Sequence, residues 1–209
     1  MDTRARHRQP ILLGVMMGSM ALAMSACAKT YVYRIEPTAV TDLSETWNDT
    51  DSRLVAQALI EQSLTSTWPN AYTDRHGGEL PTVIIGDFHN RTMDHIPVNT
   101  FVNDLEQAFM NSGRVQVVAR PGEERDDIRN EREDQQEHAR SDTRSRPAEE
   151  IGAKYMLQGE LLSMEDEEGR ERIVYYKVDA TLIDLETNLK VWSGQHEIKK
   201  HVWRKPFGI

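Results

Sequence analysis

The sequence predicts a mixed α/β domain, of the α+β kind, in which helices pack against one sheet. Residues 82–88 (TVIIGDF) form a short, almost continuously apolar run, which is typical of a buried strand. Residues 98–109 carry one apolar stripe at helical spacing, and residues 172–185 alternate between apolar and polar side chains. Helices and strands in this order favour one mixed sheet with helices packed on it.

Order along the chain is expected to begin at a helix near Asp51, with Thr50 or Asp51 as its N-cap. The helix is predicted by apolar residues that recur at helical spacing: Leu54, Val55, Ala58 and Leu59. We expect Trp68-Pro69-Asn70 to end it, because the residue before a proline disfavours the helical conformation. His76-Gly77-Gly78 then predicts a turn before the strand at residues 82–88.

The most regular helix is predicted at residues 98–109. Its apolar stripe consists of Val98, Phe101, Val102, Leu105 and Phe109. Pro97 suits the first turn of a helix, and Gly113 suits the position just after its end. Residues 114–119 (RVQVVA) predict a second strand, so that strand, helix and strand form a βαβ-like unit with parallel strands.

Residues 123–140 hold 12 charged side chains, and Ile128 is almost the only apolar residue among them. A helix that is polar all round buries little surface. We therefore expect either an exposed helix or a mobile insert here, followed by a linker at residues 140–146.

The last third of the chain predicts an antiparallel meander. Residues 147–163 predict a short helix, a break at Gly152 and a strand, and residues 164–170 predict an acidic turn. The alternating strand at 172–185 is followed by a turn at 186–188 and a returning strand at 189–198.

The N-terminal residues resemble an export signal. Residues 4–8 hold three arginines, residues 11–23 are apolar except for Ser19, and small residues precede Cys27, the one cysteine of the chain. Met24-Ser25-Ala26-Cys27 resembles the lipobox of bacterial lipoproteins, in which the thiol is acylated and the chain is cut before it; a free cysteine in an anchor helix is the alternative. Ala28 is not the aspartate that marks retention in the inner membrane. We therefore expect Cys27 to carry the lipid at the outer membrane, on its periplasmic side.

The predicted division is a signal peptide at 1–26, a flexible tether at 27–49 and a globular domain at 50–209. The whole chain has a formal net charge of −9. The signal peptide carries one acidic and three basic residues, so its removal leaves −11, which argues against a nucleic-acid partner. With its one cysteine acylated, the mature chain forms no intramolecular disulfide.

No catalytic or metal-binding motif stands out in the sequence. His89, Asp94 and His95 share one loop, but their spacing fits no standard metal template. Residues 165–169 are acidic enough to attract calcium but lack the EF-hand pattern, so a solvated hairpin tip is expected. The basic and aromatic residues 199–209 predict a frayed tail, with membrane contact as the alternative. We expect no enzymatic activity, no metal and no cofactor.

Several segments, taken in order, resemble the LpoB family: GDFHNRTMDHI, the helix at 98–109, SGRVQVVA, IGAKYMLQGEL and VYYKVDATLIDLETNLKVW. The resemblance runs from about residue 81 to 199. It implies an outer-membrane lipoprotein that binds and activates a bifunctional penicillin-binding protein of the inner membrane, by docking on its small non-catalytic domain. The resemblance further implies that this docking stimulates peptidoglycan synthesis. The resemblance also implies a four-stranded sheet flanked by helices, similar to the TolB N-terminal domain, and no enzymatic activity.

Exposed polar residues on loops and strand ends are the candidates for docking. The first choices are Asn90, Arg91, Thr92 and His95, and the second choices are Tyr155 and Glu160. Arg91 stands out because guanidinium groups are favoured at interfaces, although each residue could instead stabilise the fold, as Asn90 would by capping a turn. Three other functions stay open: a structural envelope lipoprotein that only scaffolds, a secretion-pore subunit resembling CsgG, and an enzyme with an unrecognised site.

Overall fold

The computed structural model describes residues 33–36, 39–40, 45–145 and 150–204. The chain divides into two compact units, Met1–Glu36 and Pro37–Ile209, and the description below concerns the second. Cys27, the predicted signal peptide and residues 205–209 lie outside the described residues, as does much of the predicted tether.

One sheet of five strands frames this unit, in the order β2-β1-β3-β4-β5. The strands are β1 (Thr82–Asn90), β2 (Gln116–Val117), β3 (Tyr155–Glu168), β4 (Glu171–Asp184) and β5 (Lys190–Trp203). β1 is parallel to β2 and β3, whereas β3, β4 and β5 form an antiparallel meander. The predicted mixed sheet, parallel crossover and meander are confirmed, and the sheet has one strand more than the four that the family resemblance implied.

The edge strand β2 is shorter than the predicted strand at 114–119. The N–H of Val118 still donates to the carbonyl of Val83 at 2.9 Å. Two residues further along, the N–H of Arg120 donates instead to the carboxylate of Glu124 at 3.1 Å. Pairing with β1 therefore stops early, because the chain turns away into the following helix.

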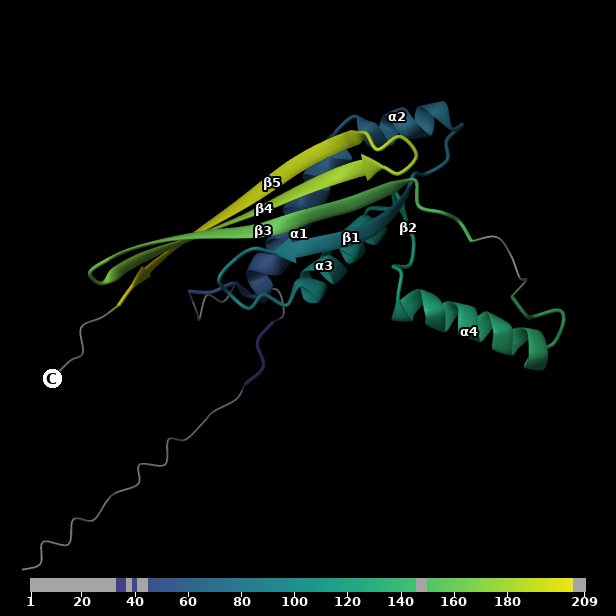
Figure 1. Cartoon of the computed structure of the whole chain (residues 1–209), viewed down its shortest axis with the longest axis horizontal. Coiled ribbons are helices and arrows are strands. Elements are labelled where there is room, and N and C mark those ends of the chain that lie inside the picture. Colours follow the sequence, from purple (N-terminus) through teal and green to yellow (C-terminus); the bar gives the residue numbers. More distant parts are fainter. Residues whose placement is uncertain (1–32, 37–38, 41–44, 146–149, 205–209) are drawn as a thin grey trace, which may run out of the picture. The chain divides into compact units, whose positions relative to one another are not determined.

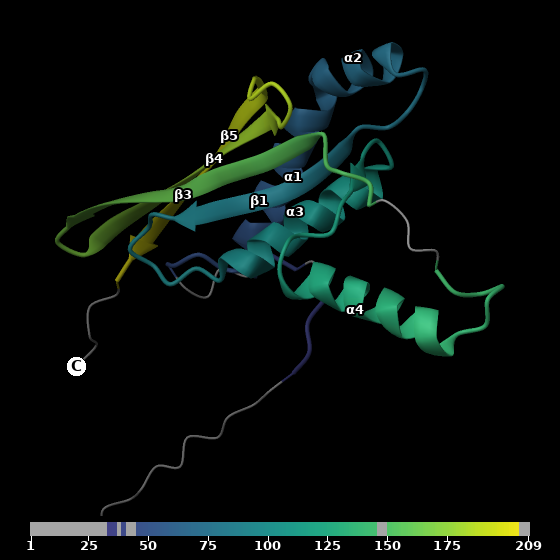
Figure 2. The same cartoon turned by 45° about the vertical axis from the view of Figure 1, so that its right-hand side comes forward.

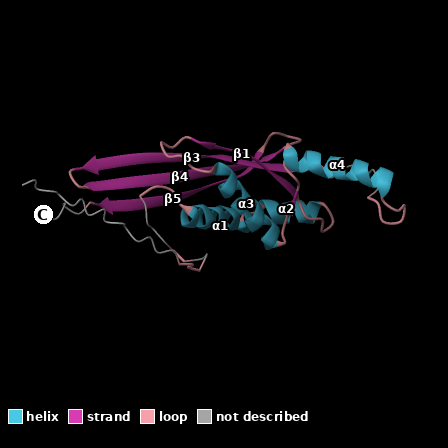
Figure 3. Ribbon diagram, turned by 90° about the horizontal axis from the view of Figure 1, so that it is seen from below, coloured by secondary structure: helices cyan, strands magenta, loops and turns pink. Residues whose placement is uncertain are grey.

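Two helices, α1 (Asp49–Thr65) and α3 (Val98–Ser112), cover one face of the sheet (Figures 1 and 3). Strand β4 shows the two faces clearly. Its buried residues alternate as predicted and face these helices: Val174, Tyr176, Val178, Ala180 and Leu182. The side chains between them point to the opposite face, which we call the open face. The open face carries Ile84, Met156, Glu160, Lys177 and Asp179.

The hydrophobic core of this unit lies within residues 47–198. α1 contributes Val55 and Leu59, and α3 contributes Phe101 and Leu105, all of them fully buried. Because the core is complete within this unit, we expect Pro37–Ile209 to fold without the residues that precede it.

The N-cap of α1 is Asn48, not Thr50 or Asp51 as predicted. Asn48 Oδ1 accepts a hydrogen bond from the Asp51 N–H at 3.0 Å, and the Asp51 carboxylate accepts one from the Asn48 N–H at 3.0 Å. This reciprocal arrangement is a capping box. Just before it, Trp47 packs edge-on against Tyr176, with ring centroids 5.6 Å apart. Contacts with the core therefore begin before the predicted domain boundary at residue 50.

The prediction that Trp68-Pro69-Asn70 ends the first helix is wrong. α1 ends at Thr65, and Pro69 lies in the first turn of a second helix, α2 (Trp68–Arg75). A proline is tolerated there, because its missing N–H would have no partner within the helix. The buried Trp68 donates its indole N–H to the carbonyl of Ser63 at 2.9 Å, which fixes α2 against the end of α1.

The charged segment forms a helix, α4 (Glu123–His138), in which no residue is buried. The exposed-helix alternative is therefore confirmed. Figure 2 shows α4 beside the layer of α1 and α3 rather than within it. The short helix predicted before Gly152 is not formed at residues 150–154, and residues 147–149 lie outside the described part of the chain.

The predicted acidic turn at 164–170 is mostly strand. β3 and β4 extend towards each other until only Gly169 and Arg170 separate them, and Gly169 takes a positive φ of 63°. Arg172 on β4 forms an ion pair with Glu165 on β3 at 2.6 Å. Such cross-strand pairing offsets repulsion in the acidic run, which lets it continue as a strand.

Candidate docking surface

The loop between β1 and α3, residues 91–97, displays alternate side chains to solvent. Arg91, Met93 and His95 point outward, and Met93 is 90% exposed. Thr92 and Asp94 are half-buried between them. We call Arg91, Met93 and His95 the docking triplet, because they form one outward-facing row of a cation, a flexible apolar chain and an imidazole.

Asn90, at the end of β1, fixes the shape of this loop. Its Oδ1 accepts hydrogen bonds from the Thr92 N–H at 2.9 Å and from the Thr92 hydroxyl at 2.7 Å. Its Nδ2 donates to the carbonyl of Asp94 at 2.8 Å. Asn90 and Thr92 are therefore occupied within the loop and hold the triplet in place, as in other asparagine-initiated turns.

Asp94 fastens the loop to the core. Its carboxylate accepts a hydrogen bond from the hydroxyl of Tyr176, whose side chain is fully buried on β4. Burial, and then the hydrogen bond to the Asp94 carboxylate, raise the pKa of Tyr176 well above its usual value. The phenol is therefore a permanent donor at neutral pH.

The docking triplet meets the open face of the sheet at Arg91, which lies beside Glu160 of β3. The Arg91 N–H donates to the carbonyl of Leu161 at 2.8 Å, which ties the start of the loop to β3. Its guanidinium lies 3.9 Å from the Glu160 carboxylate; the Arg91 side chain is largely exposed and the Glu160 side chain is about half-exposed. An exposed pair at this distance is weak, so Arg91 can exchange Glu160 for a partner group at little cost.

A shallow depression of about 240 Å³ lies beside Glu160 on the open face. It is lined by residues of β1, β3, β4 and β5: Asp87, His89, Gln158, Gly159, Glu160, Asp179, Thr181 and Lys190. His89 is the direct neighbour of Glu160 across the parallel strands. The depression and the docking triplet together form one polar surface with a single exposed apolar residue, Met93.

Tyr155 does not belong to this surface. It lies at the start of β3 on the helix-covered face, where it is 3% exposed and packs between Trp68 and Tyr72, at centroid distances of 5.2 and 5.8 Å. Burial raises the pKa of its hydroxyl. Tyr155 is a core residue, and its side chain offers no surface to a partner. Of the six predicted residues, the structure therefore brings five together.

Sequence reasoning missed Met93. A methionine in a polar loop is easily passed over, yet the alternation of Thr92, Asp94 and Ile96 inward leaves it outward. Its flexible thioether chain suits an interface that must adapt to a partner. Met93, an apolar residue with polar neighbours on both sides in HNRTMDHI, was the available signal.

The surface offers a partner charge, hydrogen-bond donors and acceptors and one exposed apolar side chain. Among the described residues, no group of three or more histidine, cysteine, aspartate or glutamate side chains could hold a metal ion. In the same part of the chain, no helix combines the length and the apolar character needed to cross a bilayer.

Comparison with known proteins identifies the family to which the chain belongs. The family model of the peptidoglycan-synthase activator LpoB matches residues 51–198, well over half of the chain. The LpoB C-terminal domain of Salmonella enterica is 16% identical, over 72% of this chain and 99% of that one, with a TM-score of 0.40. The Escherichia coli domain is 14% identical over the same shares, with a TM-score of 0.43. A search among curated proteins found no match. The family match shows that this chain belongs to the LpoB family of peptidoglycan-synthase activators.

Proposed function

We propose that this chain is an outer-membrane lipoprotein that binds a bifunctional penicillin-binding protein and stimulates peptidoglycan synthesis. The observation that carries the proposal is the match of residues 51–198 to the family of peptidoglycan-synthase activators. The lipobox at Met24–Cys27 supports it independently, because lipidation at Cys27 would hold the folded unit at the membrane.

Docking is proposed to use the triplet and the neighbouring open face. Met93 supplies the apolar contact that interfaces need at their centre, and Arg91 supplies donors for a carboxylate or carbonyl of the synthase. Asn90, Thr92 and Asp94 pre-order the loop, so little entropy is lost when the partner binds.

The chain is proposed to act on the synthase through binding alone. A bound protein can shift an enzyme towards its active state only if it binds that state more tightly than the inactive one. The proposed partner site is the small non-catalytic domain of an inner-membrane synthase, so the effect on glycan polymerisation would be allosteric. No group of this chain would touch the reacting atoms.

Binding of the unit Pro37–Ile209 to the purified periplasmic part of a bifunctional synthase tests the surface. We expect Met93→Ala combined with Arg91→Ala to weaken binding by about tenfold or more, as loss of a central contact does. Met110→Ala combined with Arg140→Ala is the matched control, because both residues are exposed and lie outside the loop.

The alternative is a structural envelope lipoprotein that only scaffolds other proteins. Synthase binding without any increase in glycan polymerisation would support this alternative. Equal binding by both double variants would instead remove the docking triplet from the proposal.

A further inference from the structure

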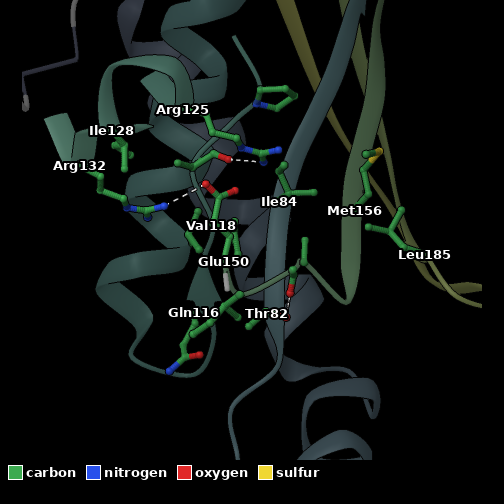
Figure 4. Close-up of a pocket in the computed structure, with 16 residues that line it drawn as sticks. Thr82, Ile84, Gln116, Val118, Arg125, Ile128, Arg132, Glu150, Met156 and Leu185 are labelled. Atoms are coloured by element: carbon green, nitrogen blue, oxygen red, sulfur yellow. Dashed lines mark hydrogen bonds and ion pairs between the residues drawn. The ribbon is translucent and has the colours of Figure 1, made fainter. Parts of the chain in front are cut away.

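A cavity of about 840 Å³ lies between α4 and the open face of the sheet (Figure 4), and no residue of the docking triplet lines it. Its floor is formed by Ile84 of β1 and Met156 of β3, and Val118 and Leu185 close its sides. This volume lies in the range of about 300–1,000 Å³ found for small-molecule sites.

The cavity is largely apolar, and α4 does not fill it. Ile128 is the single aliphatic side chain that α4 places there, and it remains 38% exposed. Ile151 and Leu185, which also line the cavity, are exposed as well. The buried apolar side chains that form the core pack together with α1 and α3, whereas several apolar side chains gather here along one open space.

Arginines from one face of α4 form the upper rim. Arg125 donates to the carbonyl of Ala119 at 2.7 Å, and Arg132 donates to Glu150 Oε1 at 3.0 Å. Arg129 forms two hydrogen bonds of 3.0 Å with the same Glu150. The rim thus holds two guanidinium groups, those of Arg125 and Arg132, and one carboxylate, that of Glu150, which Arg129 also binds from outside the lining, in a chain whose net charge is −9.

The rim arginines retain binding capacity. A guanidinium has five N–H donors, and each of Arg125 and Arg132 uses one in these bonds. Both side chains project over the cavity from the same side (Figure 4). A planar anionic group placed between them would meet donors arranged for a carboxylate or a phosphate.

We infer that this cavity binds a single-chain amphiphile with an anionic head, its acyl chain on the floor at Ile84 and Met156 and its head at Arg125 and Arg132. The apolar floor and the arginine rim together select this class of ligand. An apolar floor alone would accept a neutral chain, and an arginine rim alone would accept a free anion. The inference does not depend on the proposed activation of a synthase.

Calorimetric titration of detergent-free Pro37–Ile209 with laurate, below its micelle concentration, tests the inference. We expect saturable one-to-one binding that weakens by about tenfold from the twelve-carbon to the ten-carbon acid, because each buried methylene contributes up to about fourfold. Two-dimensional NMR should place the shifted resonances at Ile84, Met156 and Ile128. Lauroyl lysophosphatidylglycerol, titrated in parallel, distinguishes a phosphate-bearing lipid from a free fatty acid as the preferred source.

Two variants separate the head site from the apolar part of the cavity. Arg125→Gln with Arg132→Gln should weaken laurate binding by at least tenfold, whereas Arg140→Gln, outside the cavity, should leave it unchanged. Ile128→Glu should also weaken it, by placing a carboxylate inside the cavity.

The control for Ile128→Glu is Asn130→Glu, which adds the same charge on the exposed helix outside the cavity. Equal binding of laurate and dodecyltrimethylammonium would overturn the inference, because the head site would then not recognise an anion. Absence of binding by both laurate and the lysophospholipid, or NMR shifts confined to other surfaces, would overturn it as well.

Discussion

Removal of the Tyr176 hydroxyl tests whether the docking loop is anchored to the core as described. Tyr176→Phe keeps the buried ring and its packing against Trp47, so the loss is confined to the polar contacts of the hydroxyl, chiefly the hydrogen bond to Asp94 beside a contact with the backbone of Trp47. A hydrogen bond to a charged group contributes about 1.5–3 kcal/mol. Asp94 is half-buried and regains some water, so we expect a loss in the lower half of this range, about 1.5–2 kcal/mol in the free energy of unfolding.

Urea denaturation of Pro37–Ile209 measures this change as a lower midpoint with an unchanged slope. Tyr175→Phe is the matched control, because Tyr175 lies on the open face and is half-exposed. A loss below about 0.5 kcal/mol for Tyr176→Phe, or an equal loss for Tyr175→Phe, would refute the anchoring role. A double-mutant cycle with Asp94→Asn gives the coupling between the two groups directly.

The effect of Tyr176→Phe on the free energy of unfolding should also depend on pH. Burial raises the pKa of Tyr176 above the unperturbed value of about 10, so its protonated form is favoured by folding. The stability that this shift contributes is fully present below about pH 10 and is lost as the pH rises through the pKa of Tyr176 in the folded state. The difference in unfolding free energy between the natural chain and Tyr176→Phe should therefore shrink above about pH 10, where a constant difference would contradict the raised pKa.

Three further predictions concern the frame and the anchor. Lys200→Met should lower the free energy of unfolding, measured by urea denaturation, by about 3 kcal/mol, because it removes the ammonium that lies 2.6 Å from the buried Asp51 carboxylate. Lys199→Met, which changes an exposed lysine, should lower it little. Gly159→Ala should lower the urea midpoint strongly, because its Cβ would lie 2.1 Å from the Asp179 carbonyl oxygen; an unchanged midpoint would show that the strands can separate there. Cys27→Ala should abolish membrane attachment in cell fractionation and leave synthase binding by the purified chain intact, and attachment that survived would contradict the lipobox.

The regular elements could be predicted because their apolar patterns are strong. The stripe from Val98 to Phe109 and the alternation from Val174 to Leu182 each have one favourable arrangement, with the apolar side buried. The ends of the helices were harder to place. Asn48 is the N-cap of α1 because its backbone and side chain both bond to Asp51, whereas the apolar spacing from which the helix was predicted only begins at Leu54.

The docking surface could be predicted only in part. The loop after β1 followed from the position of the strand, but the outward direction of Met93 depends on the bonds that Asn90 and Asp94 make. Tyr155 could have been recognised as a core residue, because it shares the alternation of Leu157 on β3. The cavity beneath α4 could not be predicted, since nothing in the local sequence shows where an exposed helix will lie.

The rate of glycan-strand polymerisation by a purified bifunctional synthase, measured against the concentration of added Pro37–Ile209, tests the central claim most directly. We expect the natural unit and Met110→Asp to raise the rate along the same curve, and Met93→Asp to need at least about tenfold more protein for the same effect. A rate that stays at the synthase's own level at every concentration of the natural unit would contradict the proposed activator function.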